Sequence, residues 1–152
     1  MSEPFLRDNT EIVERFFRAI NDHDPDAAAA LVAEDSEFVE YATGQTYRGP
    51  DGVRANYKFW IGAFPDGQVE IRNLIDGGDK VVVEYTGRGT NTGPMMTEHG
   101  EMPPTGRSVT LEFCDVVEIK GDKMAGGRSY FDTGSMMRQL GLLPETTGAA
   151  SS

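Results

Sequence analysis

The spacing of apolar residues changes once along this chain, and that change limits what it can fold into. As far as Phe64 the apolar residues recur three or four positions apart, which predicts helices over residues 9–21 and 49–64. From Val69 onward they alternate with polar residues, which predicts strands. We expect these strands over residues 69–75, 80–90, 107–119 and 124–131.

Shorter elements complete the expected order. Asp24 and Pro25 suit the start of a second helix that carries the Ala-rich stretch to Ala33, and a short strand is expected over 37–42. A closing helix is expected over 133–140. Because helices are segregated from a series of strands joined by hairpin turns, we predict an α+β fold, with the strongly twisted strands curling around the first helix.

The chain of 152 residues contains no Pro-rich or Gly-rich linker, which indicates one domain over residues 9–144. Residues 1–8 and 145–152 are expected to be tails, the second of them disordered. Residues 91–106, rich in Thr, Gly, Pro and Met, are expected to form a long loop, with two interpretations open: a lid over a pocket, or a surface that binds a partner.

The charge argues against several classes of partner. With 14 Lys and Arg against 25 Asp and Glu, the net charge of −11 repels phosphate backbones and anionic membranes, so we expect neither nucleic acid nor membrane as a partner. No apolar run approaches the roughly 20 residues of a membrane helix. The start of the chain does not resemble a signal peptide, so the expected location is the cytoplasm.

Cysteine and histidine are scarce. The single cysteine, Cys114, lies in an apolar strand pattern with no base near it in sequence. His23 and His99 are the only histidines, and no Cys/His cluster has the spacing of metal ligands. No glycine motif has the spacing of a dinucleotide-binding loop. We therefore expect no metal and no cofactor.

Seven short phrases in this order resemble the SnoaL-like polyketide cyclase family, within the nuclear transport factor 2-like superfamily. They are Tyr47-Arg48-Gly49, Ala63-Phe64-Pro65-Asp66, Gly78-Asp79-Lys80-Val81, the run from Gly87 to Gly93, the run from Pro103 to Arg107, Tyr130-Phe131-Asp132, and Arg138-Gln139-Leu140-Gly141. The resemblance implies a cone-shaped fold around an apolar pocket. It also implies a cofactor-free enzyme that closes a polyketide ring by intramolecular aldol condensation, and a homodimer formed through the open sheet face.

The family's acid/base aspartate precedes the closing Gln-Leu-Gly, which corresponds to Asp132 here. A carboxylate beside an apolar cavity loses solvation, so its pKa would rise and it could exchange protons with carbon and oxygen. The alternative is that Asp132 caps the final helix. Possible polar partners are Asp115, whose strand phase places it among apolar neighbours, and Arg128, Asn91 and His99.

Aromatic side chains are expected to line the pocket and to contact a small apolar or aromatic ligand that carries a carbonyl group. They are Phe16, Tyr41, Tyr57, Trp60, Phe113 and Tyr130. Three other functions stay open. They are a ketosteroid isomerase-like enzyme, an epoxide hydrolase-like enzyme, and a non-catalytic module that binds a small ligand.

Overall fold

The computed structural model describes residues 9–143. The expected tails, residues 1–8 and 145–152, lie outside this range. The elements in chain order are α1 (Asn9–Asn21), α2 (Pro25–Ala29), β1 (Val32–Glu40), β2 (Gln45–Arg48), α3 (Gly49–Ala63), β3 (Gln68–Asp76), β4 (Lys80–Thr90), β5 (Met95–Thr97), β6 (Gly100–Met102), β7 (Ser108–Lys120), β8 (Lys123–Tyr130) and α4 (Thr133–Gln139).

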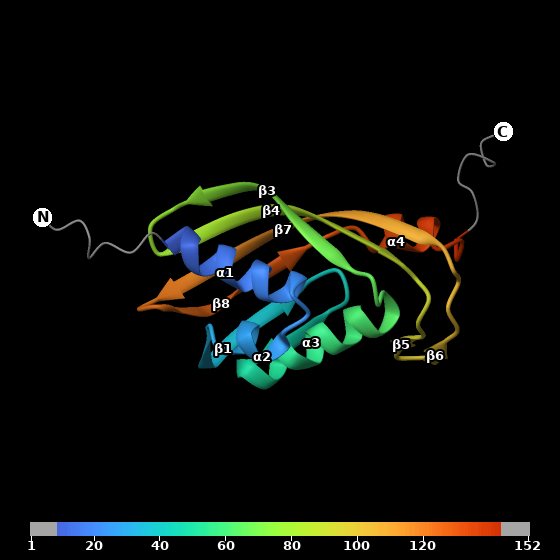
Figure 1. Ribbon diagram of the computed structural model, residues 1–152, viewed down its shortest axis with the longest axis horizontal. Helices are drawn as coiled ribbons and strands as arrows, with labels where there is room; N and C mark the ends of the chain where they lie inside the picture. The colour runs from blue at the N-terminus through green and yellow to red at the C-terminus, as the bar shows by residue number, and fades with distance from the viewer. Residues whose placement is uncertain (1–8, 144–152) are drawn as a thin grey trace, which may run out of the picture.

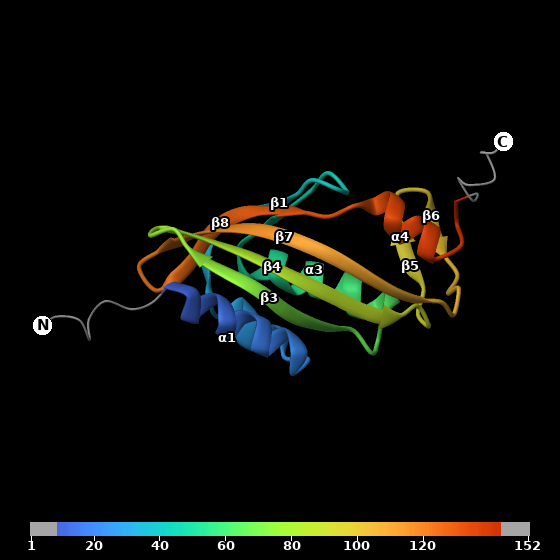
Figure 2. The ribbon, with the colours of Figure 1, turned by 90° about the horizontal axis from the view of Figure 1, so that it is seen from above.

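Six strands form one curved sheet in the order β2-β1-β8-β7-β4-β3, and β5 pairs with β6 in a separate hairpin. Helices α1, α2 and α3 lie on one face of the sheet, and the other face is open (Figures 1 and 2). Helix α4 and the β5–β6 hairpin sit together at one end of the molecule (Figure 1). The predicted α+β class, with helices packed on a curved and mostly antiparallel sheet, is confirmed.

The first helix and the four long strands occur where the apolar spacing predicts them, within one residue at either end. The second helix ends at Ala29, earlier than expected, because Leu31 and Val32 are buried and join β8, where the Met124 amide donates to the Leu31 carbonyl. Two features were not predicted from the sequence. Strand β2 follows the turn after β1, and the expected long loop contains the β5–β6 hairpin.

The core lies between α1 and the concave face of the sheet. Ile12, Val13 and Phe17 of α1 pack against the buried side chains of Val81 and Val83 on β4. These valines share one face of β4 because side chains two residues apart point the same way. Alternation along the long strands therefore separates a helix-covered apolar face from the open face.

The one parallel pairing of the sheet joins β1 to β8, with Phe38 opposite Gly127 and Glu40 opposite Ser129. Gly127 has no side chain at this point. A Cβ there would lie 3.1 Å from the ring of Phe38 and would collide with the carbonyl oxygen of Val116 on β7. The bare backbone of Gly127 therefore lets β1 approach β8 with Phe38 packed over it.

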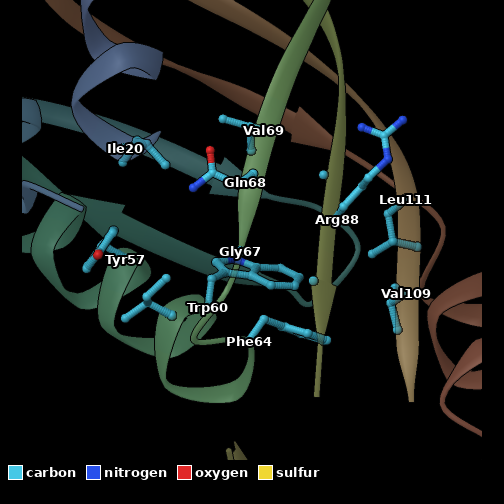
Figure 3. A pocket seen from close by; sticks show the side chains of 13 residues that line it. Ile20, Tyr57, Trp60, Phe64, Gly67, Gln68, Val69, Arg88, Val109 and Leu111 are labelled. Atoms are coloured by element: carbon cyan, nitrogen blue, oxygen red, sulfur yellow. The ribbon is translucent and has the colours of Figure 1, made fainter. Parts of the chain in front are cut away.

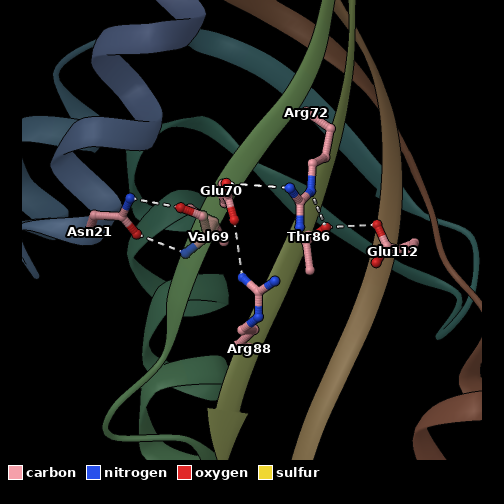
Figure 4. A network of polar contacts seen from close by, with 7 residues as sticks. All are labelled: Asn21, Val69, Glu70, Arg72, Thr86, Arg88 and Glu112. Atoms are coloured by element: carbon pink, nitrogen blue, oxygen red, sulfur yellow. Dashed lines mark hydrogen bonds and ion pairs between the residues drawn. The ribbon is translucent and has the colours of Figure 1, made fainter.

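Polar side chains hold the edge strand β3 in place (Figure 4). The Asn21 amide at the end of α1 donates to the Val69 carbonyl and accepts from the Val69 amide, both at 2.8 Å, so it completes hydrogen bonds that an edge strand leaves free. On the open face, Thr86 accepts from Arg72 at 3.0 Å and donates to Glu112 at 2.7 Å. These contacts tie β3, β4 and β7 together.

The segment after β4 is fixed to α3 through Asn91. The Asn91 side chain is buried, and its amide nitrogen donates to the carbonyls of Ala63 and Gly93 at 3.0 and 2.9 Å. Its oxygen accepts from the amide and the hydroxyl of Thr105 at 2.8 and 2.9 Å. Asn91 therefore fastens both ends of the 91–106 segment to the end of α3.

Replacement of Asn91 by alanine is expected to destabilise the protein by about 3 kcal/mol, because each buried polar partner left unsatisfied costs roughly 1–3 kcal/mol. Urea denaturation of wild type and Asn91→Ala measures this difference. Asn73→Ala, which removes an exposed amide from the open face, serves as the control and should change stability by less than about 0.5 kcal/mol. A loss below about 1 kcal/mol for Asn91→Ala would contradict the anchoring role.

Candidate active site

A cavity of about 190 Å³ lies between α1, α3 and the concave face of the sheet. Aromatic and aliphatic side chains form most of its wall, and the polar groups are few. The polar side chains on the wall are Glu40, Tyr47, Asn56, Tyr57, Tyr85, Asp115 and Ser129. Largely apolar walls with a few convergent polar groups are typical of a small-molecule site.

Asp115 on β7 is one of the two carboxyl groups that line this cavity. Its Oδ2 accepts from the Tyr85 hydroxyl at 3.0 Å, while its Oδ1 is buried and receives no hydrogen bond from residues 9–143. Burial raises the pKa of Asp115 to about 7, against the lowering effect of the hydrogen bonds from Ser129 and Tyr85. The negative charge of Glu40 raises it further. Asp115 therefore exchanges a proton near neutral pH.

Tyr85 keeps its hydroxyl proton over the same pH range. Its pKa is raised well above the usual value, first by burial and then by the adjacent Asp115 charge. Its ring stacks on Phe113 with centroids 4.8 Å apart, and it meets Phe17 edge to face. Packing thus fixes the Tyr85 hydroxyl as a donor to Asp115.

Glu40 on β1 supplies a second carboxyl group to the cavity. It is 6% exposed, and its two oxygens accept hydrogen bonds from the Thr43 hydroxyl at 2.7 Å and from the Asn56 amide at 3.4 Å. Across the sheet, Glu40 is the register partner of Ser129, and Ser129 is the partner of Asp115. The three residues form one row, so the two acidic residues are about 10 Å apart at the backbone, twice the usual strand spacing.

Asp132, the first choice from the sequence, lies outside this row. It is exposed and is the N-cap of α4, where Oδ1 accepts from the amides of Gly134 at 2.8 Å and Ser135 at 3.3 Å. It is not among the residues that line the cavity. The geometry matches the alternative interpretation of this aspartate, a helix cap.

The other proposed polar partners are also placed away from the cavity. Arg128 pairs with Glu118 at 3.4 Å, not with Asp132. Both the nitrogen and the oxygen of the Asn91 side-chain amide form the hydrogen bonds that anchor residues 91–106 to the end of α3. His99 lies at the tip of the β5–β6 hairpin, 89% exposed and beside Glu98, so that hairpin is no lid over the cavity.

The expected aromatic wall is divided between the two faces of the sheet. Phe16, Tyr57, Trp60 and Phe113 line the cavity. Tyr41 and Tyr130 instead stack on each other with centroids 5.2 Å apart, and they are 55% and 43% exposed. Tyr130 points away from the cavity because its neighbour Ser129 points into it.

Five polar residues of the cavity wall were not predicted, namely Glu40, Tyr47, Asn56, Tyr85 and Ser129. Alternation along the strands carries a signal for two of them. Glu40 is two positions from Phe38, Tyr85 is two positions from Val83, and both therefore share a face with a core residue. Ser129 faces inward because it is the register partner of Asp115.

Two further findings concern metal ions and membrane-spanning helices. Within residues 9–143 no three His, Cys, Asp or Glu side chains lie together where they could hold a metal ion. Over the same residues, each helix is too short or too polar to cross a membrane.

The sequence matches the family model described as SnoaL-like polyketide cyclase over residues 10–140, which is most of the chain. No curated protein matches the chain in sequence.

Solved structures with the same fold cover nearly the whole chain. A candidate SnoaL-like polyketide cyclase from Jannaschia sp. CCS1 has a TM-score of 0.77 and 21% identity, covering 90% of this chain and 94% of that chain. IdmH, a candidate polyketide cyclase from Streptomyces antibioticus, has a TM-score of 0.74 and 22% identity, covering 89% and 99%. A protein from Catenulispora acidiphila with a ketosteroid isomerase-like fold has a TM-score of 0.74 and 21% identity, covering 88% and 94%. At these sequence identities, the similarity to the three solved structures shows the fold of this chain.

The raised pKa of Asp115 predicts a pH dependence of stability. The folded state holds the Asp115 proton up to a pH of about 7, while the unfolded chain releases it near pH 4. Between these values, stability therefore falls as the pH rises, by up to about 1.4 kcal/mol per pH unit. Below pH 4 the group is protonated in both states and contributes no pH dependence.

Urea denaturation of wild type and Asp115→Asn at several pH values isolates this effect from other titrating groups. We expect the stability of wild type relative to Asp115→Asn to decrease from pH 4 to pH 7 and then level off. A difference that is constant across this range would show that Asp115 has an ordinary pKa.

Proposed function

We propose that this chain, which belongs to the SnoaL-like polyketide cyclase family, closes a ring in a small carbonyl-containing molecule by proton transfer between two carboxyl groups. The family supports a cyclase-like enzyme that acts on a small molecule. The reaction proposed is an intramolecular aldol condensation that needs no cofactor. The observation that carries the proposal is the buried carboxyl of Asp115, in one row with Glu40 on the cavity wall.

The two carboxyl groups have different surroundings, and this difference supports an assignment of roles. Glu40 accepts two hydrogen bonds from polar neighbours, which suits a charged carboxylate. Asp115 sits among apolar groups with one unpartnered oxygen, which suits a carboxylic acid that holds its proton. We assign Glu40 as the base and Asp115 as the acid.

The proposed steps balance as follows. The Glu40 carboxylate removes a proton from the carbon beside one carbonyl group, and an enolate forms. The enolate carbon attacks a second carbonyl carbon of the same molecule, and the new carbon–carbon bond closes the ring. The Asp115 carboxyl gives its proton to the alkoxide oxygen produced. Transfer of one proton from Glu40 back to Asp115 restores the enzyme.

The cavity wall supports this chemistry in two ways. The aromatic rings of Phe16, Tyr57, Trp60 and Phe113 exclude water, which strengthens the electrostatic effect of the few polar groups present. The cavity wall also holds a flexible chain folded so that its two reacting carbons meet. The ligand that suits such a wall is apolar or aromatic and carries carbonyl groups.

Isomerisation is the second candidate, because moving a proton from one carbon to another needs the same pair of groups. The structural neighbour with a ketosteroid isomerase-like fold supports it. Analysis of the product distinguishes the two reactions, since only ring closure forms a new carbon–carbon bond.

Exchange of carbon-bound protons for deuterium tests the first step without knowledge of the natural substrate. The probe is 4-phenylbutan-2-one, a small neutral ketone, and NMR in D₂O follows its exchange. We expect catalysis by wild type, with Glu40→Gln and Asp115→Asn each slower by about a hundredfold or more, the usual contribution of a general acid or base.

Asp132→Asn is the matched control, because asparagine caps a helix as well as aspartate does. It should change the exchange rate by less than about twofold. A hundredfold loss in Asp132→Asn with full activity in Asp115→Asn would return the acid/base role to Asp132. Binding of the ketone without any exchange would favour a non-catalytic module.

A further inference from the structure

The cavity that holds Asp115 adjoins a second, smaller one, and we propose that this second chamber binds an apolar six-membered ring of the substrate. The inference rests on the proposed function, because it places the reacting carbonyl groups in the first cavity. It adds the shape of the substrate. The substrate is elongated, with a reactive carbonyl group at one end and an apolar ring at the other.

The second chamber has a volume of about 110 Å³ and lies between the end of α3, the start of β3 and the inner face of β4 and β7 (Figure 3). Trp60 and Phe64 face Val109 and Leu111 across it (Figure 3).

The two chambers share part of their walls. Ile20, Tyr57, Trp60 and Val69 line both of them. Trp60 and Tyr57 therefore form a wall that continues from one chamber to the next. This continuity is the reason to assign the second chamber to the same ligand and not to a separate one.

Two glycines on β4 shape the second chamber. Gly89 and Gly87 are the register partners of Val109 and Leu111 on β7. A Cβ at Gly89 would lie 2.8 Å from Cβ of Phe64, and a Cβ at Gly87 would lie 3.0 Å from the ring of Phe113. Without these side chains, aromatic groups pack against the bare strand and form a flat apolar wall.

The residues that line the second chamber suit an apolar ligand group. Among residues 9–143, no acidic residue lines it, whereas Glu40 and Asp115 both line the first. Its one charged residue, Arg88, is half exposed and pairs with Glu70 at 3.2 Å. An apolar cavity of about 150 Å³ stays dry and binds benzene, so a chamber of this size suits one six-membered ring. The distribution of charge orients the ligand, with the carbonyl end toward Asp115.

A matched pair of ketones tests the proposal. Butan-2-one and 4-phenylbutan-2-one differ only by the phenyl group, and deuterium exchange gives kcat/KM for each. We expect wild type to favour the phenyl ketone by at least about tenfold.

Val109→Phe fills the chamber and should lower this preference by about tenfold. Val82→Phe adds the same side chain to the same sheet and should leave the preference unchanged, because Val82 points to the open face between the buried Val81 and Val83.

Equal preference in wild type and Val109→Phe would overturn the proposal. If Val109→Phe does not fold, Val109→Ala replaces it, and the enlarged chamber should raise the preference for 4-(2-naphthyl)butan-2-one over 4-phenylbutan-2-one at least threefold. No such increase would also overturn the proposal.

Binding of toluene separates failure of the subsite from failure of the proposed function. Toluene has no carbonyl group, and an NMR titration should shift the methyl signals of Val109 and Leu111 and the indole signal of Trp60, the only tryptophan. These shifts with no exchange of either ketone would mean that the chamber binds a ring but the proposed chemistry is wrong. Exchange of both ketones without any toluene shift at Val109 and Leu111 would overturn the subsite alone.

Discussion

The parallel pairing of β1 with β8 is the constraint on which the site depends. It joins the helical first half of the chain to the strands of the second half, and it sets Glu40 beside Ser129 and, one strand further, Asp115. The bare backbone of Gly127 permits the approach, because Phe38 packs where a side chain would stand. A change in this register by one residue would turn Glu40 to the opposite face of the sheet. The relation between the two acidic residues is therefore a property of strand pairing and not of local sequence.

Desolvation determines the acid/base chemistry of Asp115. The same apolar wall that buries α1 against the sheet surrounds the Asp115 carboxyl and raises its pKa to about 7. Tyr85, stacked on Phe113, donates to this carboxyl and opposes that rise only in part. Glu40 retains polar partners, so the two carboxyl groups have different surroundings although they share a cavity. Burial of Asp115 lowers the stability of the protein. The same burial produces a group that can transfer a proton at neutral pH.

Apolar spacing predicted the long elements and the α+β class because periodicity is local. It also placed Asp115 on the inner face of its strand. It did not predict β2, whose four residues have too little pattern, or the row that contains Glu40 and Ser129, which requires pairing between strands far apart in the sequence. Tyr41 and Tyr130 were assigned to the pocket as aromatics, but strand phase turns Tyr130 outward, and Tyr41, in the turn after β1, stacks on it. Position in the chain alone did not distinguish a catalytic aspartate from a helix cap at Asp132.

The central claim is that Asp115, inside the cavity, is the carboxyl group with a pKa near neutrality. The most direct test is a carbon-detected NMR titration of the side-chain carboxyl groups, with Asp115→Asn to assign the signal. The structure predicts a midpoint near pH 7 for Asp115. A midpoint near the ~3.9 of a solvated aspartate would contradict the account, because it would show a carboxyl group in contact with water and not one held in an apolar cavity.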